Sequence, residues 1–346
     1  MRAFILIILS AYWISCDVAS AEDLASPSQN AEVQVNRIQE LLVAAKAAAA
    51  RRDYAECARV ADEIIAIEPD HIEAITIRGA MRGLRGDYDG ALADYTRAIE
   101  ESPTPLYAAH VARGLTRRNV GQLRGAVADF SQALELNPDD HRIVEARAIT
   151  LHALGECEGA IEDCNVLLER APKSVTALIT RGSAKRDSGD AQSAIDDYSQ
   201  ALEIDPDNAM AYTNRGSVWL ELSNYESAIA DFTAAIERSP RSAGIYVNRS
   251  TAWSKLGNEE RSDEDIETAI RVAPRSPDGY IARGVSRDLK GQLELAAEDY
   301  SKAIELDPKN GHAYARRAKV YASLGKSEQA KADAEVATKL GEPTKL

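Results

Sequence analysis

Arginine and aspartate side chains recur along this chain of 346 residues at spacings that would bring opposite charges together. Eight arginines stand 34 or 35 residues apart, at Arg78, Arg113, Arg147, Arg181, Arg215, Arg249, Arg283 and Arg317. An aspartate follows each of them by 16 residues: Asp94, Asp129, Asp163, Asp197, Asp231, Asp265, Asp299 and Asp333. Guanidinium and carboxylate groups form bidentate ion pairs, which specify helix packing more surely than they stabilise it. Each arginine after Arg78 also follows the preceding aspartate of this series by 18 or 19 residues. We therefore predict a ladder of ion pairs that sets the register between neighbouring helices, rather than a polybasic binding strip.

The remaining chemically active side chains lack the spacings that catalysis or metal binding requires. No H-E-x-x-H motif, nucleophile elbow, phosphate-binding glycine loop or C-x-x-C pair occurs in the sequence. None of the five histidines falls in a metal-binding spacing: His71, His110, His141, His152 and His312. We predict no catalytic residue, no metal site and no cofactor, and we expect the protein not to be an enzyme.

Three cysteines, Cys57, Cys157 and Cys164, lie beyond the N-terminal segment. Cys157 and Cys164 are seven residues apart on one expected helix, which separates them by about 10 Å along its axis, too far for a disulfide bond. Both occupy positions that are apolar in other copies of the repeat. We predict that they are small buried hydrophobic residues.

The elements that position these side chains are repeated units of about 34 residues, each with two helical patterns. A glycine such as Gly86 or Gly121 follows the first helix, and a proline such as Pro103 or Pro138 follows the second. These residues end helices because glycine accepts a positive φ and proline cannot continue a helix. The composition is rich in alanine with only 5% aromatic residues, which favours an all-α fold. The expected repeats are 38–71, 72–105, 107–140, 141–174, 175–208, 209–242, 243–276, 277–310 and 311–344.

The recurring order of Gly, Gly, Ala, aromatic, Ala and Pro resembles the tetratricopeptide repeat family, from residue 38 to the C-terminus. The resemblance implies a right-handed α-solenoid of about nine helix-turn-helix repeats, whose first helices line a concave groove. The departures are local. The first repeat has Ala45 and Cys57 where Gly and Ala are expected, and the seventh has Ser250 and Ser262.

By the same resemblance, certain positions of the first helices would bind a partner. The side chains at these positions would line the groove; they are small, of mixed polarity and lightly basic. Such a lining suits an extended peptide or protein segment. The chaperone-tail clamp of the family is absent, because Ile179 and Ser183 stand where its first Lys and Asn should be. Solvated helix faces without a ligand remain the alternative. The candidate partner-binding residues are Arg118, Asn119, Arg142, Ile179, Arg186, Thr213, Asn214, Ser217, Val247, Asn248 and Thr251, with Ile281 at an equivalent position.

The formal net charge of −14 would repel a polyanion, so nucleic acid is not expected as a partner. We predict a non-enzymatic scaffold for protein–protein interaction that binds a peptide or protein segment. The alternative is an accessory sensing or delivery subunit of an envelope enzyme or secretion complex.

The N-terminal residues have the features of a secretory signal peptide. Arg2 precedes an almost wholly apolar run from Ala3 to Ser15, and Ala19 and Ala21 match an A-x-A cleavage pattern. We expect cleavage near Ala21, a flexible tether over residues 22–37, and a secreted or periplasmic mature protein. A lipid anchor at Cys16 is the minor alternative. No second apolar stretch approaches about 18 residues, so no membrane span is expected in the mature chain.

Overall fold

The structure is a computed structural model that describes residues 29–344, with side chains from Val33 onward. This part of the chain contains eighteen α-helices and no strand, which confirms the all-α prediction. Its residues cluster into two compact units that divide at Pro172 and Lys173. The first unit contains α2 (Gln29–Ala50), α3 (Tyr54–Ile67), α4 (Ile72–Leu84), α5 (Tyr88–Glu101), α6 (Tyr107–Asn119), α7 (Leu123–Leu136), α8 (His141–Leu154) and α9 (Cys157–Arg170).

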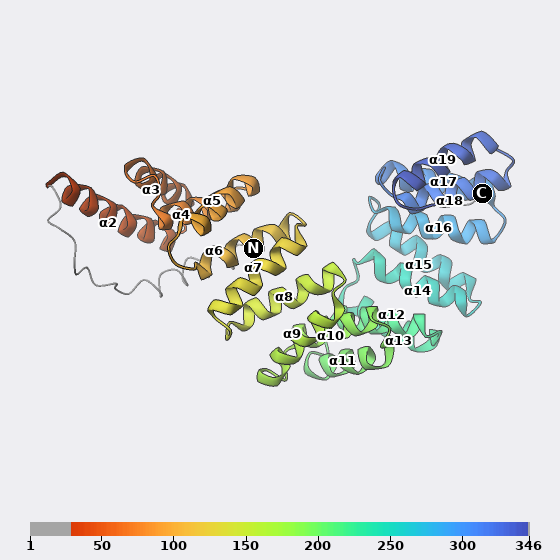
Figure 1. Ribbon diagram of the computed structural model, residues 1–346. Helices are drawn as coiled ribbons and strands as arrows, with labels where there is room; N and C mark the ends of the chain where they lie inside the picture. The colour runs from red at the N-terminus through yellow and green to blue at the C-terminus, as the bar shows by residue number, and fades with distance from the viewer. Residues whose placement is uncertain (1–28, 345–346) are drawn as a thin grey trace. The chain divides into compact units, whose positions relative to one another are not determined.

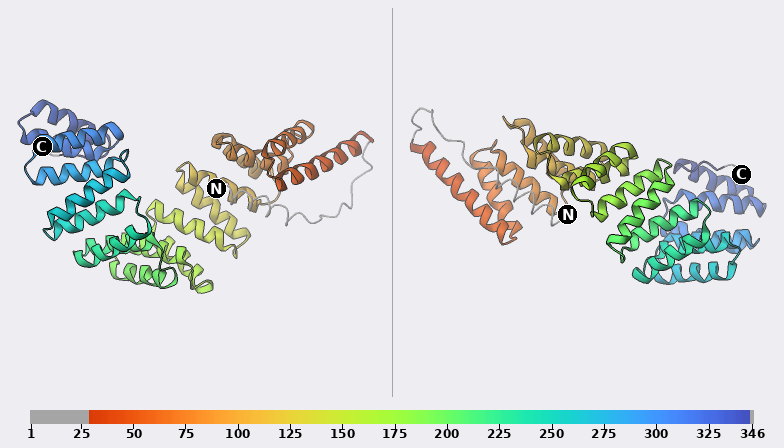
Figure 2. Two further views of the ribbon diagram at one scale, coloured as in Figure 1. Left: turned by 180° about the vertical axis from the view of Figure 1, so that it is seen from behind. Right: turned by 90° about the horizontal axis from the view of Figure 1, so that it is seen from below.

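The second unit contains α10 (Val175–Asp187), α11 (Ala191–Ile204), α12 (Ala209–Glu221), α13 (Tyr225–Arg238), α14 (Ala243–Lys255), α15 (Glu259–Val272), α16 (Pro277–Leu289), α17 (Leu293–Leu306), α18 (Gly311–Ser323) and α19 (Ser327–Lys339). Each even-numbered helix packs against the odd-numbered helix that follows it, so the helices form nine consecutive hairpins in residues 29–344 (Figure 1). Figure 2 shows the same pairing from two other directions.

Side-chain caps explain why many of the helices begin where they do. The Asp87 carboxylate accepts a hydrogen bond of 2.9 Å from the Gly90 amide at the start of α5. The Asn208 amide oxygen accepts one of 3.0 Å from the Ala211 amide at the start of α12. Such caps satisfy backbone N–H groups that have no partner in the first helical turn.

The first helix departs from the sequence expectation at its N-terminal end. Helix α2 begins at Gln29, so residues 29–37 are helical, although the whole of 22–37 was expected to be a tether. No glycine or proline occurs from residue 28 to residue 50, and Gln, Glu, Ala and Arg favour helix strongly enough to extend it. The expected signal peptide, its cleavage site near Ala21 and Cys16 lie outside the described residues.

The turn inside a hairpin uses a residue with positive φ. Glycine fills this place in most repeats, with φ of 92° at Gly189, for example. Two repeats use other residues, Arg52 with φ 58° and Ser223 with φ 60°. Because this conformation is unfavourable for residues with a Cβ atom, those two turns carry local strain.

Each hairpin is held together where a small residue faces a large one. A Cβ atom built on Gly216 of α12 would lie 2.9 Å from Phe232 of α13, so the two helices can only approach this closely with glycine there. Phe232 is fully buried, together with Ala228 and Ala235 of the same helix. Ile245 of α14 completes this cluster, so the core runs on from one hairpin into the next.

The arginine–aspartate ladder is confirmed, with one change in its partners. All eight arginines bind the aspartate 16 residues later, at N···O distances from 2.6 to 2.9 Å. The second partner is not the preceding aspartate. In five repeats the second partner is the serine or threonine two residues after that aspartate, and its hydroxyl oxygen accepts a hydrogen bond from Nη1 of the arginine. The pairs are Arg113 and Thr96, Arg147 and Ser131, Arg215 and Ser199, Arg249 and Thr233, and Arg317 and Ser301.

The cysteine prediction is confirmed for Cys164, which is buried, but not for Cys157, which is only half-buried; Cys57 is buried as well. Cys157 is the first residue of α9, where a helix end leaves one side of the side chain open. All three are free thiols.

Within each unit, the first helices of the hairpins lie on the side where neighbouring repeats approach most closely. Helix α12 contacts both α10 and α14, helix α14 also contacts α16, and in the first unit α4 contacts α6. No contact of similar extent joins successive second helices in the described part of the chain. First helices therefore line the inner side of the stack. No helix between residues 29 and 344 has both the length and the apolar character needed to cross a bilayer.

Candidate functional site: a cleft between helices α14 and α16

The seventh repeat has an aliphatic side chain where its two neighbours have an aromatic ring. Ile266 of α15 occupies the position that holds Phe232 in the sixth repeat and Tyr300 in the eighth. Ser250 and Ser262 replace the Gly or Ala that other repeats place at the hairpin crossing. Loss of an aromatic ring from a packed interface leaves space that small residues cannot fill.

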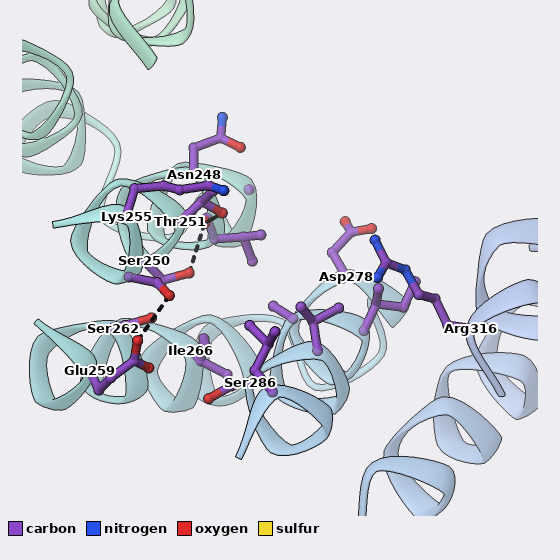
Figure 3. Close-up of a pocket in the computed structure, with 17 residues that line it drawn as sticks. Asn248, Ser250, Thr251, Lys255, Glu259, Ser262, Ile266, Asp278, Ser286 and Arg316 are labelled. Atoms are coloured by element: carbon purple, nitrogen blue, oxygen red, sulfur yellow. Dashed lines mark hydrogen bonds between the residues drawn. The ribbon is translucent and has the colours of Figure 1, made fainter. Parts of the chain in front are cut away.

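That space is part of a cleft of about 1010 Å³ in the second unit. Its walls come from α14, α15 and α16, and Arg316 of α18 closes one end (Figure 3). A volume of this size suits a ligand of several residues or a small molecule.

The apolar part of the cleft comes from aliphatic side chains on all three walls. Val247 belongs to α14, Ile266 to α15, and Ile281 and Val285 to α16. Leu289, the last residue of α16, also lines the cleft and is 76% exposed, although it is a large aliphatic residue. An exposed leucine at the edge of an apolar cleft offers area that a partner could cover.

Two serines bring polar groups into the same cleft. The Ser250 hydroxyl donates to the carbonyl oxygen of Val247 at 2.7 Å, one turn earlier on α14. Ser262 also lines the cleft, and the residue is only 2% exposed.

Charged groups stand at both ends of the cleft. Lys255 and Arg316 line it, and neither has a carboxylate within ion-pair distance among the described residues. The acids beside them already have contacts. Glu259 accepts a hydrogen bond of 3.1 Å from the Ser254 hydroxyl and lies 3.8 Å from Lys290. Asp278 accepts one of 2.9 Å from the Ser276 hydroxyl.

The structure brings three of the predicted partner-binding residues together here. Val247, Asn248 and Thr251 line the cleft, as does Ile281 at its equivalent position on α16. The α14 residues share one side of the helix because Thr251 lies three residues after Asn248 and four after Val247.

Other predicted residues use their polar groups within the stack. The Thr213 hydroxyl donates to the Ala209 carbonyl at 2.7 Å, and the Ser217 hydroxyl donates to that of Thr213 at 2.9 Å. The Asn214 amide reaches the Ser183 hydroxyl at 3.5 Å. Ile179 is buried in α10. These four residues do not line the cleft.

The predicted arginines are partly neutralised by neighbouring acids. Arg186 binds the carboxylate of Glu221, which ends helix α12, through two nitrogens, and Arg142 binds Asp140 at 2.7 Å. Burial lowers the pKa of Arg118, while the nearby Glu145 carboxylate opposes this effect. Asn119 is exposed at the end of α6. Neither Arg186 nor Arg142 is therefore a free cation for a partner.

Sequence reasoning did not select Lys255, Ser262, Leu289 or Arg316. Two signals pointed to this repeat: the replacement of Gly and Ala by Ser250 and Ser262, and the missing aromatic residue at Ile266. Within residues 29–344, no three His, Cys, Asp or Glu side chains are grouped so as to hold a metal ion.

Comparison with known families gives matches over more than half of the chain. A model described as "Tetratricopeptide repeat" matches residues 111–175 and 179–243. A second with the same description matches residues 311–340, and one described as "TPR repeat" matches 289–325. A curated relative is the tetratricopeptide repeat and J domain-containing co-chaperone DNJ1 of Mycosarcoma maydis, 34% identical over 50 residues. That match spans 14% of this chain and only 9% of the relative's length.

Solved structures with the same fold include a tetratricopeptide repeat protein from Parabacteroides merdae. It is 24% identical, the match covers 72% of this chain and 98% of that one, and the TM-score is 0.63. Yeast Tom70 is 17% identical, with 88% of this chain and 78% of that chain covered and a TM-score of 0.57. At these identities the likeness concerns the fold alone.

Proposed function

We propose, because the chain belongs to the tetratricopeptide repeat family, that it is a non-enzymatic scaffold that binds a segment of a partner protein in the cleft between α14 and α16. Repeats of this family typically serve protein–protein interaction. The observation that carries the proposal is the cleft itself, in which aliphatic residues, serine hydroxyls and charged groups of both signs face one space.

An extended segment fits this cleft better than a folded surface. The walls are helices that present both aliphatic and polar side chains to the cleft, as α14 does with Val247, Asn248 and Thr251. An extended peptide presents backbone amides and alternate side chains to such a lining. The Asn248 amide has both a donor and an acceptor for a peptide backbone.

We also propose that the protein is exported, with the mature chain beginning near Glu22. The support is the apolar run Ala3 to Ser15 and the small residues Ala19 and Ala21. The mass of the mature N-terminal peptide from the source cells tests this: Glu22 is the expected first residue. An acylated Cys16 would replace soluble export by a lipid anchor, and an intact Met1 would contradict export altogether.

A site-specific crosslinking experiment tests the scaffold proposal. A photoreactive amino acid at Thr251, which is exposed in the cleft, is expected to capture a discrete partner in intact cells. The same group at Glu264, an exposed residue of α15 that does not line the cleft, is the matched control. Leu289→Glu should abolish capture without unfolding the protein, because Leu289 is exposed at the end of its helix.

Two results would contradict the proposal. One is equal capture of the same proteins from Thr251 and Glu264. The other is capture from Thr251 that persists in the Leu289→Glu variant.

A further inference from the structure

The junction between the seventh and eighth repeats is held by charged side chains. Lys290, which directly follows α16, donates hydrogen bonds of 2.8 and 2.6 Å to the two carboxylate oxygens of Asp263 in α15. The Ser286 hydroxyl of α16 donates to one of the same oxygens at 2.9 Å. A single carboxylate of the seventh repeat therefore binds two groups of the eighth.

The same three positions are apolar at the neighbouring junctions. Between the eighth and ninth repeats they hold Ala297, Val320 and Leu324, which pack together in one hydrophobic cluster. Among the eight junctions in residues 29–344, only the one with Asp263 has an acidic residue in this set. The equivalent residues of the two preceding junctions are Ile195, Val218 and Leu222, and then Ile229, Ala252 and Leu256.

A second ion pair crosses the same junction. Nη1 of Arg283 donates to the Glu267 carboxylate of α15 at 2.9 Å, in the place where five other ladder arginines bind a serine or threonine hydroxyl. The side chains of Glu267 and Asp263 are 59% and 50% exposed. Exposed ion pairs contribute little to stability and are screened by salt, whereas the burial of aliphatic groups is not. We therefore expect this junction to be weaker than those on either side and more sensitive to salt.

The inner side of the junction is packed differently. Helices α14 and α16 contact each other more extensively than any other two successive first helices in the described part of the chain. Ser286 also lines the cleft, together with Ile281 and Val285 of the same helix (Figure 3). A rotation of α16 about its contact with α14 would therefore change the width of the cleft.

From these contacts we propose that the junction between α15 and α16 is a hinge, held closed by a polar latch that consists of Asp263, Ser286 and Lys290. When the latch opens, residues 277–344 rotate relative to residues 175–276 about the contact between α14 and α16. Such rotations arise where an interface has two arrangements of similar free energy. The hinge goes beyond the proposed scaffold function, because it exists whether or not a partner is bound. A segment that enters the cleft would favour the position of α16 that it binds more tightly.

The test measures distances between two nitroxide labels by double electron–electron resonance. It uses the purified chain from Glu22 onward with its native cysteines replaced by alanine, and circular dichroism checks that this chain remains helical. One pair of labels, at Glu264 of α15 and Glu298 of α17, spans the proposed hinge. The matched pair, at Asp196 of α11 and Ala230 of α13, has the same exposed repeat positions across an apolar junction.

The hinge pair should give a distance distribution roughly twofold broader than the matched pair at about 1 M salt, where the Debye length is about 3 Å. The distribution of the hinge pair should narrow at about 0.01 M salt, because the ion pairs of the latch are then much less screened. The matched pair should not respond to salt, since aliphatic side chains hold its junction.

Three variants locate the effect in the latch. Lys290→Gln removes the ammonium group and should broaden the hinge distribution at low salt, whereas Lys290→Arg keeps the charge and should leave it unchanged. Asp263→Ile combined with Lys290→Leu gives this junction the side chains of its neighbours. That double variant should narrow the distribution to the width of the matched pair at every salt concentration. If it does not fold, the comparison of Lys290→Gln with Lys290→Arg decides.

Three outcomes would overturn the inference. The first is an equal width for both pairs of labels at every salt concentration. The second is equal broadening of both pairs by salt, because the motion would then belong to the whole stack. The third is a hinge distribution that stays broad in the double variant, or that Lys290→Gln leaves unchanged at low salt. None of these results depends on capture from Thr251, so the scaffold proposal stands or fails separately.

Discussion

Tyr300 is an aromatic residue at a hairpin crossing whose hydroxyl oxygen has an unusual environment. It is fully buried, and its hydroxyl has no hydrogen-bond partner among the described residues. At the equivalent place, the Tyr198 hydroxyl lies 3.0 Å from that of Ser183, whereas the eighth repeat has Val285 in place of this serine. Burial accordingly raises the pKa of Tyr300. An unsatisfied buried hydroxyl is unfavourable by about 1–3 kcal/mol.

We therefore expect Tyr300→Phe to raise the free energy of unfolding, by about 1 kcal/mol. Phenylalanine already fills this position at Phe130 and Phe232. The matched Tyr198→Phe should lower stability by a similar amount, because it removes the hydrogen bond between Tyr198 and Ser183. Urea denaturation of both variants measures the difference, and a Tyr300→Phe variant less stable than the parent would mean that the hydroxyl has a partner.

Ser223 adopts a positive φ of 60° at the turn between α12 and α13, where most repeats have glycine. Ser223→Gly should stabilise the protein by about 0.5–1 kcal/mol, because glycine adopts this conformation without a steric penalty. The reverse change, Gly189→Ala, should destabilise it, since Gly189 has φ 92° and a Cβ atom there is strained although nothing crowds it. Thermal melts that shift in the same direction for both variants would contradict this.

Asp129 is expected to make stability depend on pH. Burial alone would raise the pKa of this carboxyl, but hydrogen bonds from His110 and Arg113 and the nearby charge of Arg117 lower it overall. The pKa of Asp129 is lower in the folded state than in the unfolded state. The ionised carboxylate therefore contributes to the free energy of unfolding at pH values above the unfolded pKa of about 4, and this contribution is lost as the pH falls through the folded pKa. Asp129→Asn should flatten the acid side of a plot of urea midpoint against pH, measured by circular dichroism. An unchanged slope below pH 5 would contradict it.

At the scale of the helix, the ladder of ion pairs joins three elements at once. Arg215 of α12 binds Asp231 of α13 at 2.7 Å and donates to Ser199 of α11 at 2.9 Å. Each such arginine connects a first helix to its own second helix and to the second helix of the preceding repeat. The arginines therefore fix the register of the stack, as the 16-residue spacing indicated.

Asp197→Asn is expected to destabilise the second unit by about 3 kcal/mol. Asp197 is 1% exposed, and it is bound by Arg181 at 2.6 Å and Lys185 at 2.9 Å. The substitution keeps the shape but leaves two cations without their counter-charge. Asp196→Asn, at the exposed neighbouring residue of the same helix, is the control and should have little effect. Equal shifts of the urea midpoint in both variants would count against a structural role for the pair.

Most helices of this protein could be predicted because many of their boundaries are marked in the sequence, the start of α2 being an exception. Capping residues such as Asp87 and Asn208 begin helices, and glycines end them, so the chemistry of each boundary is local. The second partners of the ladder arginines could not be found this way, because helix rotation decides whether an aspartate or the serine or threonine two residues later faces the arginine.

The cleft was harder to predict than the helices because it arises where one repeat lacks an aromatic side chain that its neighbours have. Ile266 creates space only because Phe232 and Tyr300 fill the same position in the flanking repeats. The exposure of Leu289 depends on how α16 packs on α15. The helix positions implied by the family resemblance identified Val247 and Asn248 but not Ile266 or Leu289. Those positions mark which residues of the first helices face the groove, and they carry no information on where the packing is loose.

For the whole molecule, the repeated architecture implies unfolding in stages. Each hairpin packs mainly on its neighbours, and the described residues cluster into two units that divide after Pro172. In such arrays, stability is a sum of repeat and interface terms, and long arrays lose two-state behaviour. Trp219 and Trp253 both lie in the second unit, and the third tryptophan, Trp13, precedes the proposed cleavage site.

Tryptophan fluorescence of the mature chain therefore reports on the second unit, whereas far-ultraviolet circular dichroism reports on every helix. We expect the two urea unfolding curves not to coincide. Asp94→Asn, which removes the partner of Arg78 and Arg82 in the first unit, should shift the circular dichroism curve and leave the fluorescence midpoint in place. Asp197→Asn should shift the fluorescence midpoint, because its partners belong to the unit that contains the tryptophans. Superimposable curves that move together in both variants would show instead that a single cooperative transition governs the chain, since only then would a change in either unit reach the fluorescent residues.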